Sequence, residues 1–133
     1  MGSLIAASIV ERARALVAEL ADLAPDDAIE AINAIKLALH EVSPLRDEPV
    51  DCVLWVRSEQ VEANDYNPNQ VAPPEMRLLH ISISEDGYTQ PIVAWPEGGG
   101  YTVVDGFHRH RVGREYADVR KRVLGYLPIT VIR

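Results

Sequence analysis

Residues 101–111 read YTVVDGFHRHR, and this stretch decides the fold prediction. The part before Asp105 is rich in valine, threonine and tyrosine, which favour a β-strand. Gly106 permits the backbone conformations of a sharp turn. We predict a strand that ends at Asp105, a turn at Asp105-Gly106 and a helix that begins near Phe107.

The start of the predicted helix is a candidate site for an anion. A helix N-terminus presents unpaired backbone N–H groups and the positive end of the helix dipole, and both favour phosphate. Cationic side chains there are unfavourable by a few tenths to about 1 kcal/mol each unless an anion neutralises them. Arg109 and Arg111 also offer the two-pronged hydrogen bonding that suits phosphate oxygens, and we expect their guanidinium groups to converge on one pocket at this turn. The alternative is that each arginine pairs with a carboxylate of the chain, such as Asp105 or Glu115.

Weaker signals on both sides of this stretch predict the other elements of the domain. Residues 90–95 form a second β-rich run, and the glycine-rich loop after it indicates a hairpin. A strand is also predicted near 50–56 and a helix near 73–87. Residues 127–132 predict a closing strand, in which Pro128 favours an edge position or a strand start.

The beginning of the chain has a different pattern, that of two amphipathic helices. Apolar residues recur at three- and four-residue steps over 4–23 and again over 29–42. Pro25 separates the two runs and suits the first turn of the second helix. Such a short connection predicts an antiparallel hairpin, which must bury its apolar faces on the following domain or on a second copy, as in a homodimer. The predicted organisation is a helical hairpin at 1–43, a linker at 44–49 and a domain at 50–133.

Composition limits the classes of function. The net charge is −7, but segments 1–50, 51–100 and 101–133 carry −5, −6 and +4, so basic charge is concentrated at the end. This distribution argues against a general nucleic-acid binder and leaves room for a local anionic partner. The single cysteine excludes an internal disulfide, and we expect no metal site formed by the protein alone. The sequence has neither a membrane-spanning apolar run nor a secretory signal, so we expect a cytoplasmic protein.

Four segments resemble the ParB/sulfiredoxin superfamily in their order and spacing. They are Tyr66-Asn67-Pro68, Leu79-x-x-Ser82-Ile83-x-x-x-Gly87, Gln90-Pro91-Ile92-Val93 and Gly106-Phe107-His108-Arg109-His110-Arg111. The match covers about residues 50–133 and corresponds to the ParB-like N-terminal nucleotide-binding domain. It implies an α+β fold with a small mixed sheet and packed helices. With its preceding hairpin, the chain is similar to stand-alone bacterial ParB-domain regulators of the immunoglobulin-binding-regulator type, whose partner resembles phosphoadenosine-phosphosulfate reductase.

The resemblance also implies a ligand. In ParB proteins a Gly-Glu-Arg-Arg-x-Arg box contacts the triphosphate of CTP, and Gly106, Arg109 and Arg111 match this box by position. We therefore expect a regulatory module that binds a nucleoside triphosphate, ATP or CTP, with Mg²⁺. Phe107 replaces the acidic residue of the box and His108 its first arginine, which argues against CTP-driven switching. The candidate nucleotide- or phosphate-binding residues are Asn67, Thr89, Gln90, Gly106, Phe107, His108, Arg109, His110 and Arg111.

Single residues distinguish the other functions known for this superfamily. Sulfiredoxins have a cysteine where this chain has Phe107, so we expect no sulfinic-acid repair. Free-serine kinases of this fold carry an Asp-Gly-His-His-Arg-like turn, and in that alternative Asp105 and His108 are catalytic residues of an ATP-dependent phosphotransferase or nucleotide hydrolase. A further alternative is a DNA-associated transcription or partition regulator, although the negative net charge favours DNA contact through a partner.

Overall fold

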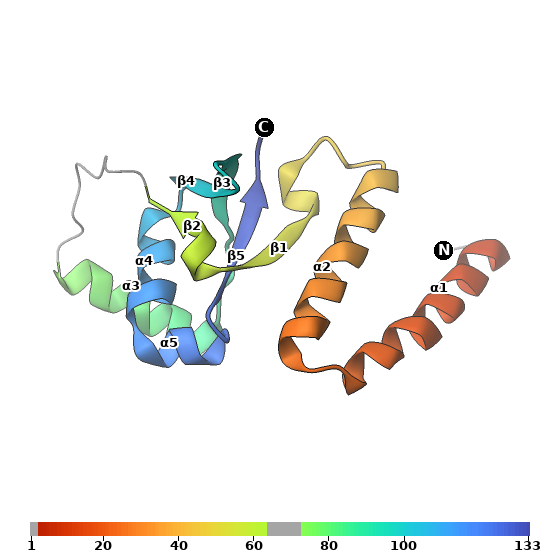
Figure 1. Cartoon of the computed structure of the whole chain (residues 1–133), viewed down its shortest axis with the longest axis horizontal. Coiled ribbons are helices and arrows are strands. Elements are labelled where there is room, and N and C mark those ends of the chain that lie inside the picture. The colour runs from red at the N-terminus through yellow and green to blue at the C-terminus, as the bar shows by residue number, and fades with distance from the viewer. Residues whose placement is uncertain (1–2, 64–72) are drawn as a thin grey trace.

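The structure is a computed structural model that describes residues 3–63 and 73–133 (Figure 1). Within these residues the chain forms a five-stranded sheet in the order β1-β5-β3-β4-β2. The strands are β1 (Val53–Arg57), β2 (Val61–Glu62), β3 (Ile92–Glu97), β4 (Gly100–Asp105) and β5 (Tyr126–Val131). The α-helices are α1 (Leu4–Val17), α2 (Pro25–Val42), α3 (Pro73–Asp86), α4 (Phe107–Glu115) and α5 (Ala117–Arg122), and the short 3₁₀ helices are η1 (Ala18–Asp22), η2 (Pro49–Asp51) and η3 (Ser58–Gln60). The expected α+β class, with a small mixed sheet and packed helices, is confirmed.

The sheet combines antiparallel and parallel pairs. β3 and β4 form the predicted hairpin, β1 pairs antiparallel with β5, β3 pairs parallel with β5, and β2 pairs parallel with β4. β5 is therefore a central strand, and the edge position predicted from Pro128 is wrong. On one side, Pro128 lies opposite Trp55 of β1, and the backbone N–H and carbonyl of Trp55 form their hydrogen bonds with α2 instead of with Pro128. On the other side, pairing of β5 with β3 begins one residue later, at Ile129. The missing proline N–H is thus not needed by either neighbouring strand.

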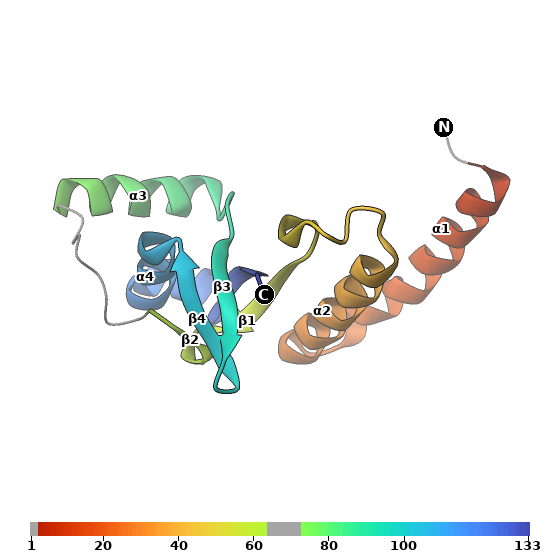
Figure 2. The same ribbon diagram turned by 90° about the horizontal axis from the view of Figure 1, so that it is seen from above.

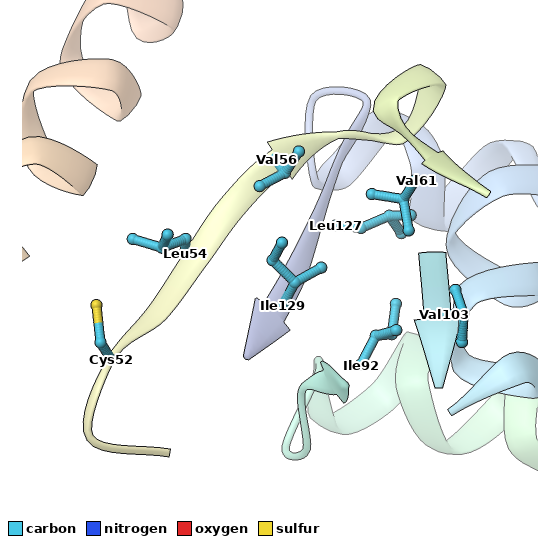
Figure 3. Packing of buried hydrophobic residues seen from close by; sticks show 8 residues of the cluster. All are labelled: Cys52, Leu54, Val56, Val61, Ile92, Val103, Leu127 and Ile129. Carbon is cyan, nitrogen blue, oxygen red and sulfur yellow. The ribbon is translucent and has the colours of Figure 1, made fainter. Parts of the chain in front are cut away.

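The core lies between the sheet and a layer of helices. A cluster of buried apolar side chains comes from all five strands of this sheet and from the residue before β1: Cys52, Leu54, Val56, Val61, Ile92, Val103, Leu127 and Ile129 (Figure 3). α4 packs against β3, β4 and β5, and Gly113 permits the close approach because a side chain there would collide with Tyr88 and Leu127. A second cluster joins α3, α4 and α5 through Met76, Ile83, Val112 and Val119. Packing on the sheet and on two helices therefore fixes the position of α4.

The two predicted N-terminal helices form, but they do not pack side by side as an antiparallel hairpin would. α2 runs beside β1 and is attached to it by polar side chains, Asp26, Asn33 and Lys36. α1 extends away from the rest of the molecule (Figures 1 and 2), and every side chain from Ser3 to Glu19 is exposed. None of the helices in the described residues combines the length and hydropathy needed to cross a membrane.

Candidate functional site

The predicted strand, turn and helix are present where β4 meets α4. β4 ends at Asp105, α4 begins at Phe107, and Gly106 caps the helix with a φ of +91°, in the left-handed region that glycine adopts without strain. The Gly106 carbonyl accepts the first helical hydrogen bond, from the His110 N–H at 2.9 Å. The N–H groups of the three residues between them have no partner within the helix. The turn therefore has the donor groups of an anion-binding helix start.

The Arg109 guanidinium folds back over this turn. Its Nη1 donates to Gln90 Oε1 at 3.2 Å, and its Nη2 donates to the Pro91 carbonyl at 3.1 Å. A Cβ atom on Gly106 would lie 2.8 Å from Nη2, so glycine leaves the space that the arginine occupies. The Nε–H of Arg109 is buried and has no hydrogen-bond partner among the described residues. A buried N–H without a partner costs about 1–3 kcal/mol, so this group is a candidate for a further hydrogen bond.

A cavity of about 490 Å³ lies against a different face of α4. It is lined by residues of α4, by the last residue of β2 and by the residue that follows it: Phe107, His110, Arg111, Arg114, Glu115, Glu62 and Ala63. This volume lies in the usual range for small-molecule sites. Arg114 is a cationic residue of the cavity that the motif does not identify. Its spacing of three residues from Arg111 and four from His110 is the sequence signal that places it on the same helix face.

Arg109 and Arg111 do not converge on one point, contrary to the expectation from the sequence. Residues two apart on a helix point about 200° away from each other around its axis, which places the two guanidinium groups on opposite sides. Arg109 lies against the start of β3, whereas Arg111 lines the cavity, with its Nε 3.3 Å from Glu115 Oε1. Among the residues that the structure describes, pairing with a carboxylate is thus found for Arg111 and not for Arg109, which bonds to an amide and a carbonyl group.

His110 is buried, with 5% of its surface exposed, and holds β2 against α4. Its Nε2 donates to the Val61 carbonyl at 3.0 Å, and Arg114 Nη1 donates to the same oxygen at 3.3 Å. Burial lowers the pKa of His110, and the hydrogen bond to Val61 only partly opposes this shift. His110 is therefore a neutral structural residue whose Nε2 is already used, so it does not offer that nitrogen to a phosphate.

The remaining predicted residues divide between the turn and the surface around it. His108 is half-buried in the first turn of α4, and Asp105 is exposed at the end of β4. Thr89 is exposed just before β3, beside the Gln90 that contacts Arg109. Asn67 lies outside the described residues. In the part of the chain that the structure describes, no group of three or more histidine, cysteine, aspartate or glutamate side chains is placed to hold a metal ion.

Two of the arginines near the end of the chain donate hydrogen bonds to backbone carbonyl groups of other elements. Arg122 donates to the Ile83 carbonyl at 2.6 Å and to the Ser84 carbonyl at 2.7 Å, both in the last turn of α3. Cationic side chains stabilise such helix ends because the last carbonyl groups lack helical partners. Arg114 likewise donates to the carbonyl of Val61. These arginines join structural elements, which reduces the basic surface left for nucleic acid.

Comparison with known proteins gives a sequence relative of undescribed function. No protein-family model matches the chain. The chain is 54% identical over 114 residues to the uncharacterized protein YbdM of Escherichia coli (strain K12), a match that covers 85% of this chain. The chain spans about half the length of this relative, because the match covers 54% of YbdM.

Several solved structures are similar to part of the chain, and two of them illustrate the likeness. One is the C-terminally truncated chromosome-partitioning protein ParB of Caulobacter crescentus complexed with CTP-γ-S, with a TM-score of 0.49 and 26% identity. This match covers 61% of the present chain and 44% of that ParB chain. The other is sulfiredoxin of Arabidopsis thaliana, with a TM-score of 0.49, 17% identity and coverage of 61% of this chain and 84% of the sulfiredoxin.

Proposed function

We propose that the chain is a nucleotide-binding regulatory module that holds the phosphates of a nucleoside triphosphate at the turn between β4 and α4. The observation that carries the proposal is the Arg109 side chain, whose buried Nε–H lacks an acceptor among the described residues. A phosphate oxygen beside Gly106 would accept hydrogen bonds from this group and from the N–H groups of the first helical turn. The match of Gly106, Arg109 and Arg111 to the phosphate-binding box of ParB proteins supports the same location.

The divergence of Arg109 and Arg111 suits an extended ligand better than a single phosphate. Phe107 is the first residue of α4 and also lines the 490 Å³ cavity, so the cavity begins beside the turn. In the proposed complex the triphosphate crosses the end of α4 from Arg109 toward Arg111 and Arg114, and the nucleoside lies in the cavity. Each guanidinium then serves a different part of the ligand.

Mg²⁺ would arrive with the nucleotide in this proposal. Phosphate oxygens supply several of its ligands in triphosphate complexes, and water supplies others. The chain contributes the cationic groups for the phosphates, while Asp105 is an exposed carboxylate at the turn. Regulation would follow if the occupied site changes how the domain meets a partner protein. The resemblance to stand-alone ParB-domain regulators suggests a protein related to phosphoadenosine-phosphosulfate reductase for this role.

Equilibrium binding of ATP, CTP and GTP with Mg²⁺, measured by calorimetry, tests the proposal. Replacing Arg109 with alanine is expected to weaken binding by about 1.5–3 kcal/mol, roughly ten- to hundredfold, because one charge-assisted contact is lost. Lys121→Ala is the matched control: it removes the same charge from an exposed position of α5, and binding should stay as in the native protein. Absence of binding of all three nucleotides at millimolar concentration contradicts the proposal.

The same preparations separate the alternative functions. Release of ADP or AMP from ATP, abolished by Asp105→Asn in a folded protein, would indicate the phosphotransferase or hydrolase alternative instead of simple binding. Duplex DNA binding that weakens steeply with salt would indicate the DNA-associated alternative. We favour simple nucleotide binding because its evidence is the geometry of Arg109, which concerns phosphate binding and does not by itself indicate turnover or DNA contact.

A further inference from the structure

Another cavity lies between α2 and the sheet, apart from the turn at Gly106. Its volume is about 390 Å³, within the range of small-molecule sites, and among the described residues it shares no lining residue with the 490 Å³ cavity. Its lining combines aromatic and charged residues, among them Trp55, Tyr101, Tyr126, Asp26, Glu30 and Arg57. Aromatic rings and carboxylates both attract cations, so this combination favours a positively charged ligand.

One wall of this cavity already holds a cation of the chain itself. The Arg57 guanidinium lies over the Tyr126 ring, with its Cζ 5.1 Å from the ring centroid, and its Nη2 donates to Asp26 Oδ2 at 2.9 Å. The Tyr126 hydroxyl donates to the other oxygen of this carboxylate, Asp26 Oδ1, at 2.8 Å. The hydrogen bond from Tyr126 thus holds the carboxylate beside the ring, and the two groups together accommodate a guanidinium. Because Arg57 pairs with Asp26, it neutralises one of the two carboxylates of the cavity.

Glu30 is the carboxylate of the cavity that Arg57 does not neutralise. It lies one turn after Asp26 on α2, and both residues line the same cavity. No cationic side chain among the described residues lies within ion-pair distance of Glu30. Two carboxylates and one guanidinium leave the lining with one net negative charge. The charge of the cavity therefore suits a ligand with a single positive charge.

We propose that this cavity binds a small organic monocation of the alkylguanidinium type. Its guanidinium group pairs with Glu30, and its alkyl part lies against the aromatic residues of the lining. A guanidinium is weakly hydrated and stacks on aromatic rings, as Arg57 does on Tyr126, whereas Mg²⁺ requires a shell of oxygen ligands. The inference does not depend on nucleotide binding, because the proposed nucleotide site consists of other residues.

Binding of butylguanidinium to the full chain tests the site, with the fluorescence of Trp55 as the signal. Trp55 lines the cavity, and Trp95→Phe at an exposed position leaves it as the single tryptophan of the chain. Titration at constant ionic strength is expected to give a saturable change in fluorescence. The neutral analogue butylurea has the same alkyl chain and a similar shape, and it should give no saturable change at the same concentrations.

Two glutamates of α2 provide a matched pair of variants. Glu30→Gln should weaken binding of butylguanidinium roughly fivefold, because the ion pair with the ligand is lost. Glu41→Gln removes the same charge from an exposed position of α2 outside the cavity, and it should leave binding unchanged. Both side chains are exposed, so the variants should remain folded, which thermal unfolding verifies.

The charge of the cavity gives a further test through Arg57. Agmatine carries a second cationic group at the other end of the same four-carbon chain, and the native protein should bind it no more tightly than butylguanidinium, because Arg57 already pairs with Asp26. Arg57→Ala leaves Asp26 without its cation, so the preference should shift toward agmatine by roughly fivefold. The proposal is overturned by absence of a saturable signal at millimolar butylguanidinium, by equal effects of Glu30→Gln and Glu41→Gln, or by an unchanged preference in the Arg57 variant.

Discussion

Asn33 of α2 forms two hydrogen bonds with the backbone of Trp55 in β1. Asn33 Nδ2 donates to the Trp55 carbonyl at 2.7 Å, and the Trp55 N–H donates to Asn33 Oδ1 at 3.1 Å. β1 is an edge strand of the sheet, so these backbone groups would otherwise lack a protein partner. Lys36 Nζ extends the contact by donating to the Val53 carbonyl at 3.0 Å. The side chains of α2 thus replace a neighbouring strand and cover the edge.

Asn33→Ala should therefore loosen α2 from the sheet. We expect the free energy of unfolding to fall by about 1 kcal/mol, the usual net value of such hydrogen bonds. Urea denaturation measures this change, and hydrogen exchange of the Trp55 amide should accelerate. Ala34→Ser, at the next and exposed position, should leave both values unchanged. An unaltered exchange rate at Trp55 in the Asn33 variant would show that α2 does not protect this edge.

Gly106→Ala separates backbone strain from displacement of the arginine. Alanine at a positive φ costs about 1–2 kcal/mol of stability, and its Cβ would also push the Arg109 guanidinium away from the turn. Gly87→Ala imposes a comparable strain at φ +79°, with open space around the new atom. We expect both variants to lose similar stability, whereas the Gly106 variant alone loses nucleotide affinity. Equal affinities in the two variants would contradict this role of Arg109.

Stability should depend on pH through His110. Because burial lowers the folded-state pKa below the ordinary value of 6.5, the unfolded chain binds the proton more readily. The free energy of unfolding is then highest above pH 6.5 and falls as the pH drops through the folded pKa. Denaturant titrations at several pH values between about 7 and 5 should show this decrease, and His110→Gln should flatten it. Nearby Arg114 lowers the same pKa and Glu115 raises it, so changes at these residues should shift the curve in opposite directions.

Arg122→Ala should destabilise the contact between α5 and α3. The variant leaves the carbonyl groups of Ile83 and Ser84 without their charged donor, and we expect a loss of about 1–3 kcal/mol in the free energy of unfolding. Thermal or urea denaturation measures the loss. Lys121→Ala removes an equal charge from the neighbouring exposed position and should have little effect. Equal losses in the two variants would mean that net charge, and not the α3 contact, causes the change.

Local sequence signals predicted the centre of the site well. Glycine at position 106 and the β-rich run before it placed the strand end at Asp105 and the helix start at Phe107, as the structure has them. The convergence of Arg109 and Arg111 was predicted from their closeness in sequence, and it fails because helical geometry separates residues two apart. Helical periodicity, applied to these two arginines, assigns them to opposite faces of α4 from their spacing alone.

The amino-acid sequence by itself determined the local elements of this protein: the two N-terminal helices, the hairpin of β3 and β4, and the turn that starts α4. These features depend on interactions between residues a few positions apart, such as capping, turn conformation and side-chain periodicity. The tertiary structure alone decided that Gln90 meets Arg109 and that Val61 accepts from His110, contacts that join residues 19 and 49 positions apart. It also placed Pro128 in a central strand. Such pairings depend on how the whole chain packs its apolar surface, which no local segment specifies.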